Sequence, residues 1–315
     1  MQKTKVEILQ KVRPKLLTLE QERKRLLAAR RRTEINAFLL IIIGIALVLV
    51  LGIYLGEDMV TIPIIGVVAL VAVAYIYLNW KRLDARDALQ QTIGDIITEA
   101  MGGSWNYAAE KHLSPSLVKY SGLVGRFNTI HGNNLTHGEH GDTRFSFSNI
   151  NLSNQGKDGR SDVFGGIVLA IDFSKNLKGK TLVFPDIAQQ TLGAWLGKTV
   201  QSFGWKGLEL VYLEDPEFEK EFAVYSSDQV ESRYILTPNM MSNMLRLKHK
   251  YGEAFSFSFT HGTVFVAIDK VPPFESTLDA PILPDGTFYH FYKTIDLVTD
   301  IIDTLELNTR IWAKS

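Results

Sequence analysis

The sequence contains no cysteine, and this absence removes several kinds of site at once. A disulfide framework, a thiolate metal site, an iron–sulfur cluster and a cysteine nucleophile all require that residue. The absence is consistent with a reducing compartment. We also expect no bound cofactor.

The chain also lacks net charge, because 34 lysines and arginines balance 34 aspartates and glutamates. This balance hides an asymmetry, since basic residues are concentrated in the first tenth of the chain and the remainder is correspondingly acidic. No nucleic-acid partner is expected. The basic residues are Lys3, Lys5, Lys11, Arg13, Lys15, Arg23, Lys24, Arg25, Arg30, Arg31 and Arg32.

Two long apolar runs follow this basic segment. Residues 37–55 contain no charged side chain, and residues 59–78 are similar in length, with Pro63 near the start. At about 1.5 Å per residue, each helix would be about 28 Å long, which is enough to cross the hydrocarbon of a bilayer. The sequence therefore predicts two membrane-spanning helices.

The charges around these runs predict their orientation. The short turn Gly56-Glu57-Asp58 is acidic, whereas Arg30 to Arg32 and Lys81, Arg82 and Arg86 flank the pair on its other side. The positive-inside rule places both basic flanks, and so both chain termini, in the cytoplasm. Neither run contains an ionisable residue, which favours an anchor over a transporter.

The basic N-terminal segment has the apolar spacing of a coiled coil. Leu9, Val12, Leu16, Leu19 and Leu26 follow one another at three- and four-residue steps, with Arg23 at one seam position and Pro14 as an interruption. Three interpretations remain open: self-association or pairing with a partner coiled coil, a basic amphipathic helix on anionic headgroups, and a solvated helix.

Residues beyond the apolar runs alternate between helix and strand signals. Predicted strands cluster rather than alternate strictly with helices, which favours an α+β domain over a doubly wound sheet. The expected fold is a two-helix transmembrane hairpin plus a soluble α+β domain with largely antiparallel sheet. The predicted domains are residues 1–34 (basic cytosolic helix), 35–80 (transmembrane hairpin), 81–104 (juxtamembrane helix) and 105–315 (cytosolic α+β domain).

The individual elements of that domain are predicted from caps, turns and periodicity. The helices begin where Ser114, Asp215 and Thr237 each precede a proline. Turns are expected at residues 131–134, 155–159 and 261–262. The predicted strands are 124–130, 143–152, 163–173, 181–184, 208–213, 255–260 and 263–268, and the predicted helices are 81–100, 115–121, 186–203, 216–222, 238–251 and 289–307.

One cluster has metal-ligating residue types. His137, His140 and Asp142, with Glu139 between them, are candidate metal ligands. The cluster lacks the helical spacing of zinc proteases, and its glycines indicate a loop between strands. A solvated hairpin loop is the simpler interpretation.

Two phosphate-loop signals and one calcium-loop signal are incomplete. Gly-Lys-Thr occurs at Gly179 and at Gly197, but Ser174 and Leu192 stand where the phosphate loop requires its first glycine. The loop beginning at Asn154 has glycine, not glutamate, at its twelfth position. Neither motif is therefore predicted to bind its ligand.

A charged segment later in the chain supplies a second candidate site. Asp228, Glu231 and Arg233 lie close together in the sequence and are candidates for an interaction site or for catalysis. An ion-paired strand edge leading into a capped helix is the simpler interpretation.

Three strings in this region resemble a bacterial family, domain of unknown function 3137. They are Gly179-Lys-Thr-Leu-Val-Phe-Pro-Asp186, the run Asp215-Pro-Glu-Phe-Glu-Lys, and Val224-Tyr-Ser-Ser-Asp-Gln-Val-Glu-Ser-Arg-Tyr-Ile-Leu-Thr-Pro238. The resemblance implies a bacterial inner-membrane protein with two N-terminal spans, associated with LemA-type coiled-coil membrane proteins. It supplies no catalytic residues.

Together these observations predict a membrane-anchored cytosolic interaction or scaffold module of a bacterial inner-membrane assembly. The expected partners are the lipid bilayer and either another protein, such as a LemA-type protein, or a second copy of the chain. The alternative is a membrane-tethered metal-dependent hydrolase that uses the His137 cluster or the segment from Asp228 to Arg233.

Overall fold

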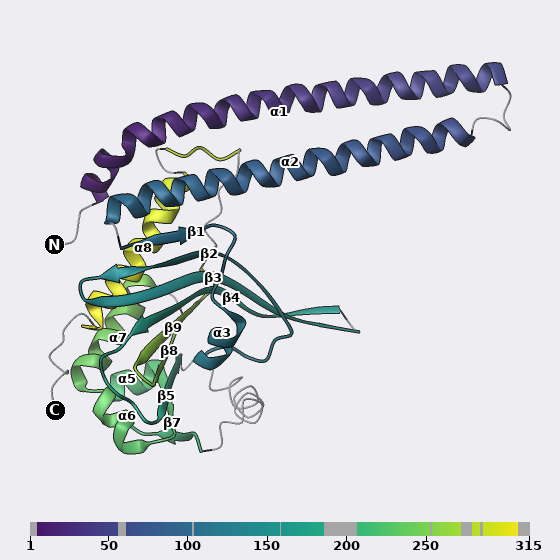
Figure 1. The fold of residues 1–315 in the computed structure, drawn as a ribbon. Helices are drawn as coiled ribbons and strands as arrows, with labels where there is room; N and C mark the ends of the chain where they lie inside the picture. The colour runs from purple at the N-terminus through teal and green to yellow at the C-terminus, as the bar shows by residue number, and fades with distance from the viewer. Residues whose placement is uncertain are drawn as a thin grey trace. The chain divides into compact units, whose positions relative to one another are not determined.

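The computed structural model describes residues 5–55, 61–102, 104–157, 159–185, 207–252, 254–271, 279–283 and 286–307. The chain divides into two compact units (Figure 1). The helical unit comprises Met1–Ala100 and Glu275–His290, and the sheet unit comprises Met101–Phe274 and Phe291–Ser315.

Two long helices, α1 (Lys5–Leu55) and α2 (Thr61–Met101), make up most of the helical unit. They run side by side in opposite directions (Figure 1). Lys15 Nζ lies 2.6 Å from Glu99 Oε2, and a Cβ added at Gly44 would lie 3.5 Å from Val67 Cγ2. The two helices therefore contact each other near both ends of the pair.

The middle of the predicted coiled-coil seam is buried within this unit, whereas Leu26 is exposed. Val12, Leu16 and Leu19 on α1 are buried, as are Ile93 and Ile97 on α2. Helix α1 continues through Pro14 without ending. These middle positions of the seam are thus covered within the chain.

Arg23 occupies a seam position and is compensated by Glu20. Its Nε and Nη2 donate to Glu20 Oε2 and Oε1 at 3.0 and 2.6 Å. Glu20 Oε2 also accepts a hydrogen bond from the backbone N–H of Ile282 at 3.0 Å. The Arg23 hydrogen bond is the largest cause of a lowered pKa for Glu20, and this pairing allows a buried charge at the seam.

The prediction of a transmembrane hairpin is wrong. Among the described residues, no helix combines the length and apolarity needed to cross a membrane. The two apolar runs are instead parts of longer helices that continue into charged sequence, and large apolar side chains such as Phe38 and Ile65 are exposed along them. The inner-membrane location, with both termini cytoplasmic, was predicted from these two spans. That prediction is therefore not supported either.

The sheet unit contains an antiparallel sheet of nine strands among the described residues, in the order β1-β2-β3-β4-β9-β8-β5-β7-β6. Every pairing is antiparallel. The predicted α+β class with a largely antiparallel sheet is confirmed. The strands are β1 (Asn106–Ala108), β2 (Thr129–His140), β3 (Thr143–Gly156), β4 (Gly159–Asp172), β5 (Lys180–Pro185), β6 (Glu209–Val211), β7 (Phe222–Ser226), β8 (Ala254–Thr260) and β9 (Thr263–Asp269).

Alternating side chains place a core on each face of this sheet. One core joins Phe257 and Val266 to Leu247 of α7 and Ile301 of α8. On the other face, neighbouring strand positions such as Val168 pack with Val118 of α3. The helices are α3 (Pro115–Ser121), α5 (Pro216–Glu221), α6 (Gln229–Ile235), α7 (Pro238–Tyr251) and α8 (Thr287–Thr304).

Local capping signals predicted several of these elements correctly. Ser114, Asp215 and Thr237 cap α3, α5 and α7, each with proline in the first turn. The turn between β8 and β9 is His261-Gly262, with φ angles of +43° and +73°. The predicted helix over 186–203 lies outside the described residues.

The prediction for residues 124–134 is wrong. Strand β2 begins only at Thr129 and runs through the predicted turn. A bulge between Asn133 and Thr136 absorbs Asn134, which has a φ of +61°. The residues that favour turns therefore form a bulge within a strand rather than a loop.

The buried seam predicts different effects at two adjacent leucines. Leu16 is 0% exposed and Leu17 is 48% exposed. Leu16→Ala is expected to lower the free energy of unfolding by about 2–5 kcal/mol, because it leaves a cavity, whereas Leu17→Ala is the matched control and should change it far less. Urea denaturation followed by circular dichroism measures both. Equal effects would show that the seam is not packed within the chain.

Candidate functional site

Two of the three strings that carry the family resemblance contain neighbouring strands of the sheet. Strand β5 pairs with β7, so that Thr181 lies opposite Ser226 and Val183 lies opposite Val224. On its other side β5 pairs with β8. The first and third strings therefore form one substructure, which continues from β7 into α6.

Glu231 of α6 binds the backbone just before β5. Its Oε1 accepts a hydrogen bond from the N–H of Lys178 and its Oε2 accepts one from the N–H of Gly179, both at 2.8 Å. A Cβ at Gly179 would lie 2.8 Å from Glu231 Oε2 and 2.9 Å from Ser227 Oγ. Only glycine allows this close approach without displacing the carboxylate. The pair of bonds fixes the backbone that carries Lys178.

The other two residues predicted with Glu231 also bind backbone groups. Asp228 caps α6, because its Oδ1 accepts from the N–H groups of Val230 and Glu231 at 2.9 and 3.0 Å. Arg233 donates to the backbone oxygen of Gln229 at 3.0 Å and to that of Tyr212 at 3.3 Å. These contacts assign the three side chains a role in holding the fold.

The candidate metal ligands are not gathered around one point. His137, Glu139 and His140 lie in β2, not in a loop, and only Gly141 and Asp142 form the turn to β3. His137 and His140 are three residues apart, which places them on opposite faces of the strand. His140 Nε2 instead lies 2.9 Å from Asp303 Oδ1. In the part of the chain that is described, no group of three metal-ligating side chains could hold an ion.

A groove opens beside β5, where three segments meet. Helix α3, the backbone that Glu231 binds, and the β8–β9 turn border this shallow, open groove, which has a volume of about 480 Å³. The groove is lined by Ser116, Lys119, Tyr120, Lys178, Gly179, Lys180, Ser227, Thr260 and His261.

The lining of this groove is basic. Lys119, Lys178 and His261 are exposed, and Lys180 is partly buried. Among the residues that the structure describes, neither aspartate nor glutamate lines it. Lys119 and Lys178 form no ion pair with any residue that the structure describes. The groove therefore presents cations that are available to an anionic ligand.

Tyr120 connects the three sides of the groove. Its hydroxyl lies 2.9 Å from Nδ1 of His261, which is also 2.8 Å from Thr260 Oγ1. Lys180 donates from Nζ to the backbone oxygen of Tyr120 and lies 5.2 Å from the centre of its ring. Tyr120 is 46% exposed, so part of its side chain is accessible beside the lysines.

Burial lowers the pKa of Lys180 to about 6. Desolvation disfavours the charged ammonium, because the low-dielectric surroundings replace water. At neutral pH Lys180 is therefore mostly a neutral amine, and it gains its charge as the pH falls through 6. The positive charge of the groove increases over the same range.

Sequence reasoning did not find this groove. Lys119, Tyr120 and Lys178 belong to none of the candidate sites predicted from the sequence, Lys180 belongs to an incomplete phosphate loop and to one of the family strings, and His261 belongs to a predicted turn. The three segments are far apart in the chain, and only the strand order brings them together.

The fold and the groove define the class of the sheet unit: an α+β domain built on an antiparallel sheet, with an open basic groove beside strand β5. Residues 162–307 match the family described as "Protein of unknown function (DUF3137)". This match supports the assignment of that region to the family and includes all three strings that carry the resemblance.

Comparisons with curated proteins and with solved structures do not extend this assignment. The chain matches no curated protein. A solved structure that it resembles is that of the mycobacterial trehalose monomycolate transport factor A, TtfA, with 10% sequence identity, 64% of this chain and 88% of that chain covered, and a TM-score of 0.32. A TM-score this low does not establish a shared fold.

The lowered pKa of Lys180 predicts a pH-dependent stability. Between pH 6 and its ordinary pKa of 10.5, the unfolded chain binds a proton that the native chain lacks. The contribution of Lys180 to the free energy of unfolding therefore rises with pH across that window. Below pH 6, burial of Lys180 destabilises the native chain by its full amount. Lys180→Met removes this contribution.

We therefore expect Lys180→Met to be more stable than the parent at pH 7, with a flatter dependence of stability on pH. Urea denaturation between pH 6 and 9 measures this, and Lys220→Met, at an exposed position on α5, is the matched control. Parallel curves for the parent and Lys180→Met would contradict the burial of this amine.

Proposed function

We propose that the chain is an interaction module whose sheet unit binds an acidic segment of a partner protein in the basic groove. The observation that carries this proposal is the convergence of Lys119, Lys178 and His261 around a groove whose described lining contains no carboxylate. Charge complementarity of this kind directs association and selects partners.

The energetics suit a reversible interaction. Each exposed ion pair contributes about 0.2–1 kcal/mol, so Lys119 and Lys178 acting together give a modest, salt-sensitive affinity. The exposed ring of Tyr120 adds apolar contact area, and tyrosine is enriched at protein interfaces. Because Glu231 holds the backbone at Lys178, part of the groove is ordered before a partner binds.

The size and charge of the groove favour a peptide segment over nucleic acid. A volume of about 480 Å³ accommodates a few side chains, whereas proteins that bind nucleic acid usually carry a basic stripe and a strong net positive charge. This chain has a net charge of zero. Pairing with a coiled-coil protein of the LemA type, or with a second copy of the chain, stays a prediction.

The hydrolase alternative receives no support from the described residues. Asp228 and Glu231 bind backbone N–H groups, and His140 lies beside Asp303. A metal-activated water requires ligands that converge on one ion, and the candidate ligands do not converge.

A short acidic peptide tests the proposal on the full chain. Fluorescein-labelled hexaglutamate is expected to bind saturably in fluorescence anisotropy, with an affinity that falls as salt is added. The double variant Lys119→Glu/Lys178→Glu should reduce the affinity at least about tenfold, if two pairs of up to about 1 kcal/mol each become repulsions.

The matched control is Lys157→Glu/Lys220→Glu, which changes net charge equally at exposed positions outside the groove. This variant should retain most of the affinity. Equal losses in both variants would show that only overall charge matters and would overturn the proposal. Binding to anionic lipid vesicles or to single-stranded DNA, with none to the peptide, would overturn it as well.

A further inference from the structure

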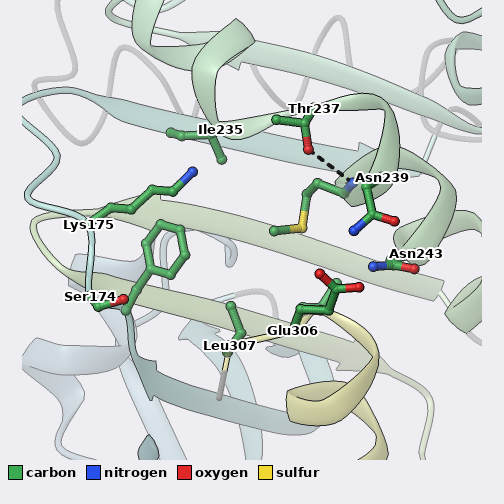
Figure 2. A pocket seen from close by; sticks show the side chains of 11 residues that line it. Ser174, Lys175, Ile235, Thr237, Asn239, Asn243, Glu306 and Leu307 are labelled. Atoms are coloured by element: carbon green, nitrogen blue, oxygen red, sulfur yellow. Dashed lines mark hydrogen bonds between the residues drawn. The ribbon is translucent and has the colours of Figure 1, made fainter. Parts of the chain in front are cut away.

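A second, smaller hollow lies at the N-terminal end of α7 (Figure 2). Its volume is about 40 Å³, which is room for about three water molecules. Three segments line it: the residues after β4, the junction of α6 with α7, and the residues after α8. A group of three heavy atoms, such as a carboxylate, has a matching size.

An unpaired amide faces this pocket. Asn243 is 5% exposed, and its Nδ2 has no hydrogen-bond partner within the described part of the chain. Figure 2 shows its amide nitrogen turned toward the pocket, beside the amide of Asn239. A buried donor without a partner costs about 1–3 kcal/mol. A ligand that offers an oxygen acceptor would recover this free energy.

The helix end adds a preference for negative charge. Thr237 caps α7, and its Oγ1 accepts from the N–H of Met240 at 3.3 Å (Figure 2). The remaining N–H dipoles of the first turn favour an anion near this end. Asn239 and Asn243 are four residues apart, so they lie on one face of the helix.

A buried lysine lies across the pocket. Lys175 is 8% exposed and lines the same hollow (Figure 2). Its Nζ lies 4.2 Å from the centre of the Tyr234 ring, and burial lowers its pKa. An anion in the pocket would offset that desolvation and raise the pKa of Lys175.

Glu306 limits the charge that the pocket accepts. Its carboxylate also lines the hollow, but the residue is exposed, so solvent screens its repulsion. A singly charged ligand is favoured over a doubly charged one such as phosphate.

We propose that this pocket binds a carboxylate group, which accepts hydrogen bonds from Asn243 and Asn239 at the N-terminus of α7. The carboxylate comes either from a small free acid or from the end of a peptide. This site is separate from the basic groove, so its failure would leave the proposed function intact.

Nuclear magnetic resonance of the full chain tests the pocket directly. Sodium acetate is expected to shift the side-chain ¹H–¹⁵N signals of Asn243 saturably, whereas acetamide and sodium chloride at equal concentrations should not. Asn243→Leu, close in volume, should abolish the acetate-dependent shifts of neighbouring backbone amides. Glu306→Gln should tighten acetate binding by about 2–5-fold, because a screened like charge is removed.

N-acetylglycine distinguishes the two sources of the carboxylate. Tighter binding than acetate assigns the pocket to a peptide terminus, and equal or weaker binding assigns it to a free acid. If Asn243→Leu does not fold, the parent titrations with acetate and acetamide still decide. Shifts that acetamide or chloride reproduces, or the absence of any saturable shift, would overturn the proposal.

Discussion

The carboxylate of Glu231 is the contact on which the candidate sites depend. It accepts two backbone hydrogen bonds at 2.8 Å from Lys178 and Gly179, in the connection between β4 and β5. A charged acceptor that takes two N–H donors makes a stronger contact than a neutral pair. Asp228, at the start of the same helix, caps it and so fixes the position of Glu231.

This connection lines both hollows of the sheet unit. Its first residues, including Lys175, border the small pocket at α7, and its last residues, Lys178 and Gly179, border the basic groove. Because α6 leads directly into α7, the helix that supplies Glu231 is also adjacent to the pocket. One short charged segment therefore positions a lysine for each site.

The sequence predicted those parts of the fold that depend on local rules. Three caps followed by proline, the β8–β9 turn and the strands rich in alternating phenylalanine were each placed correctly. Strand β2 was missed because Gly132 resembles a turn residue. A Cβ there would lie 2.5 Å from the backbone oxygen of Asn149. A tertiary contact therefore requires glycine at this position, and local sequence patterns do not reveal such a contact.

The candidate sites were largely beyond sequence reasoning for a related reason. Asp228, Glu231 and Arg233 stay untested as an interaction site, and the partners that the structure shows are backbone groups up to 53 residues away. The groove depends on the antiparallel order β9-β8-β5-β7, which brings Tyr120, Lys180 and His261 to one place. Pairing order of this kind is not contained in the periodicity of any single strand.

Amide hydrogen exchange at Lys178 and Gly179, measured in the full chain and in Glu231→Ala, tests this account most directly. If the carboxylate holds this backbone, both amides exchange slowly in the parent and both exchange much faster in the variant, while amides of β8 and β9 keep their protection. Unchanged exchange at Lys178 and Gly179 in a folded variant would contradict the account.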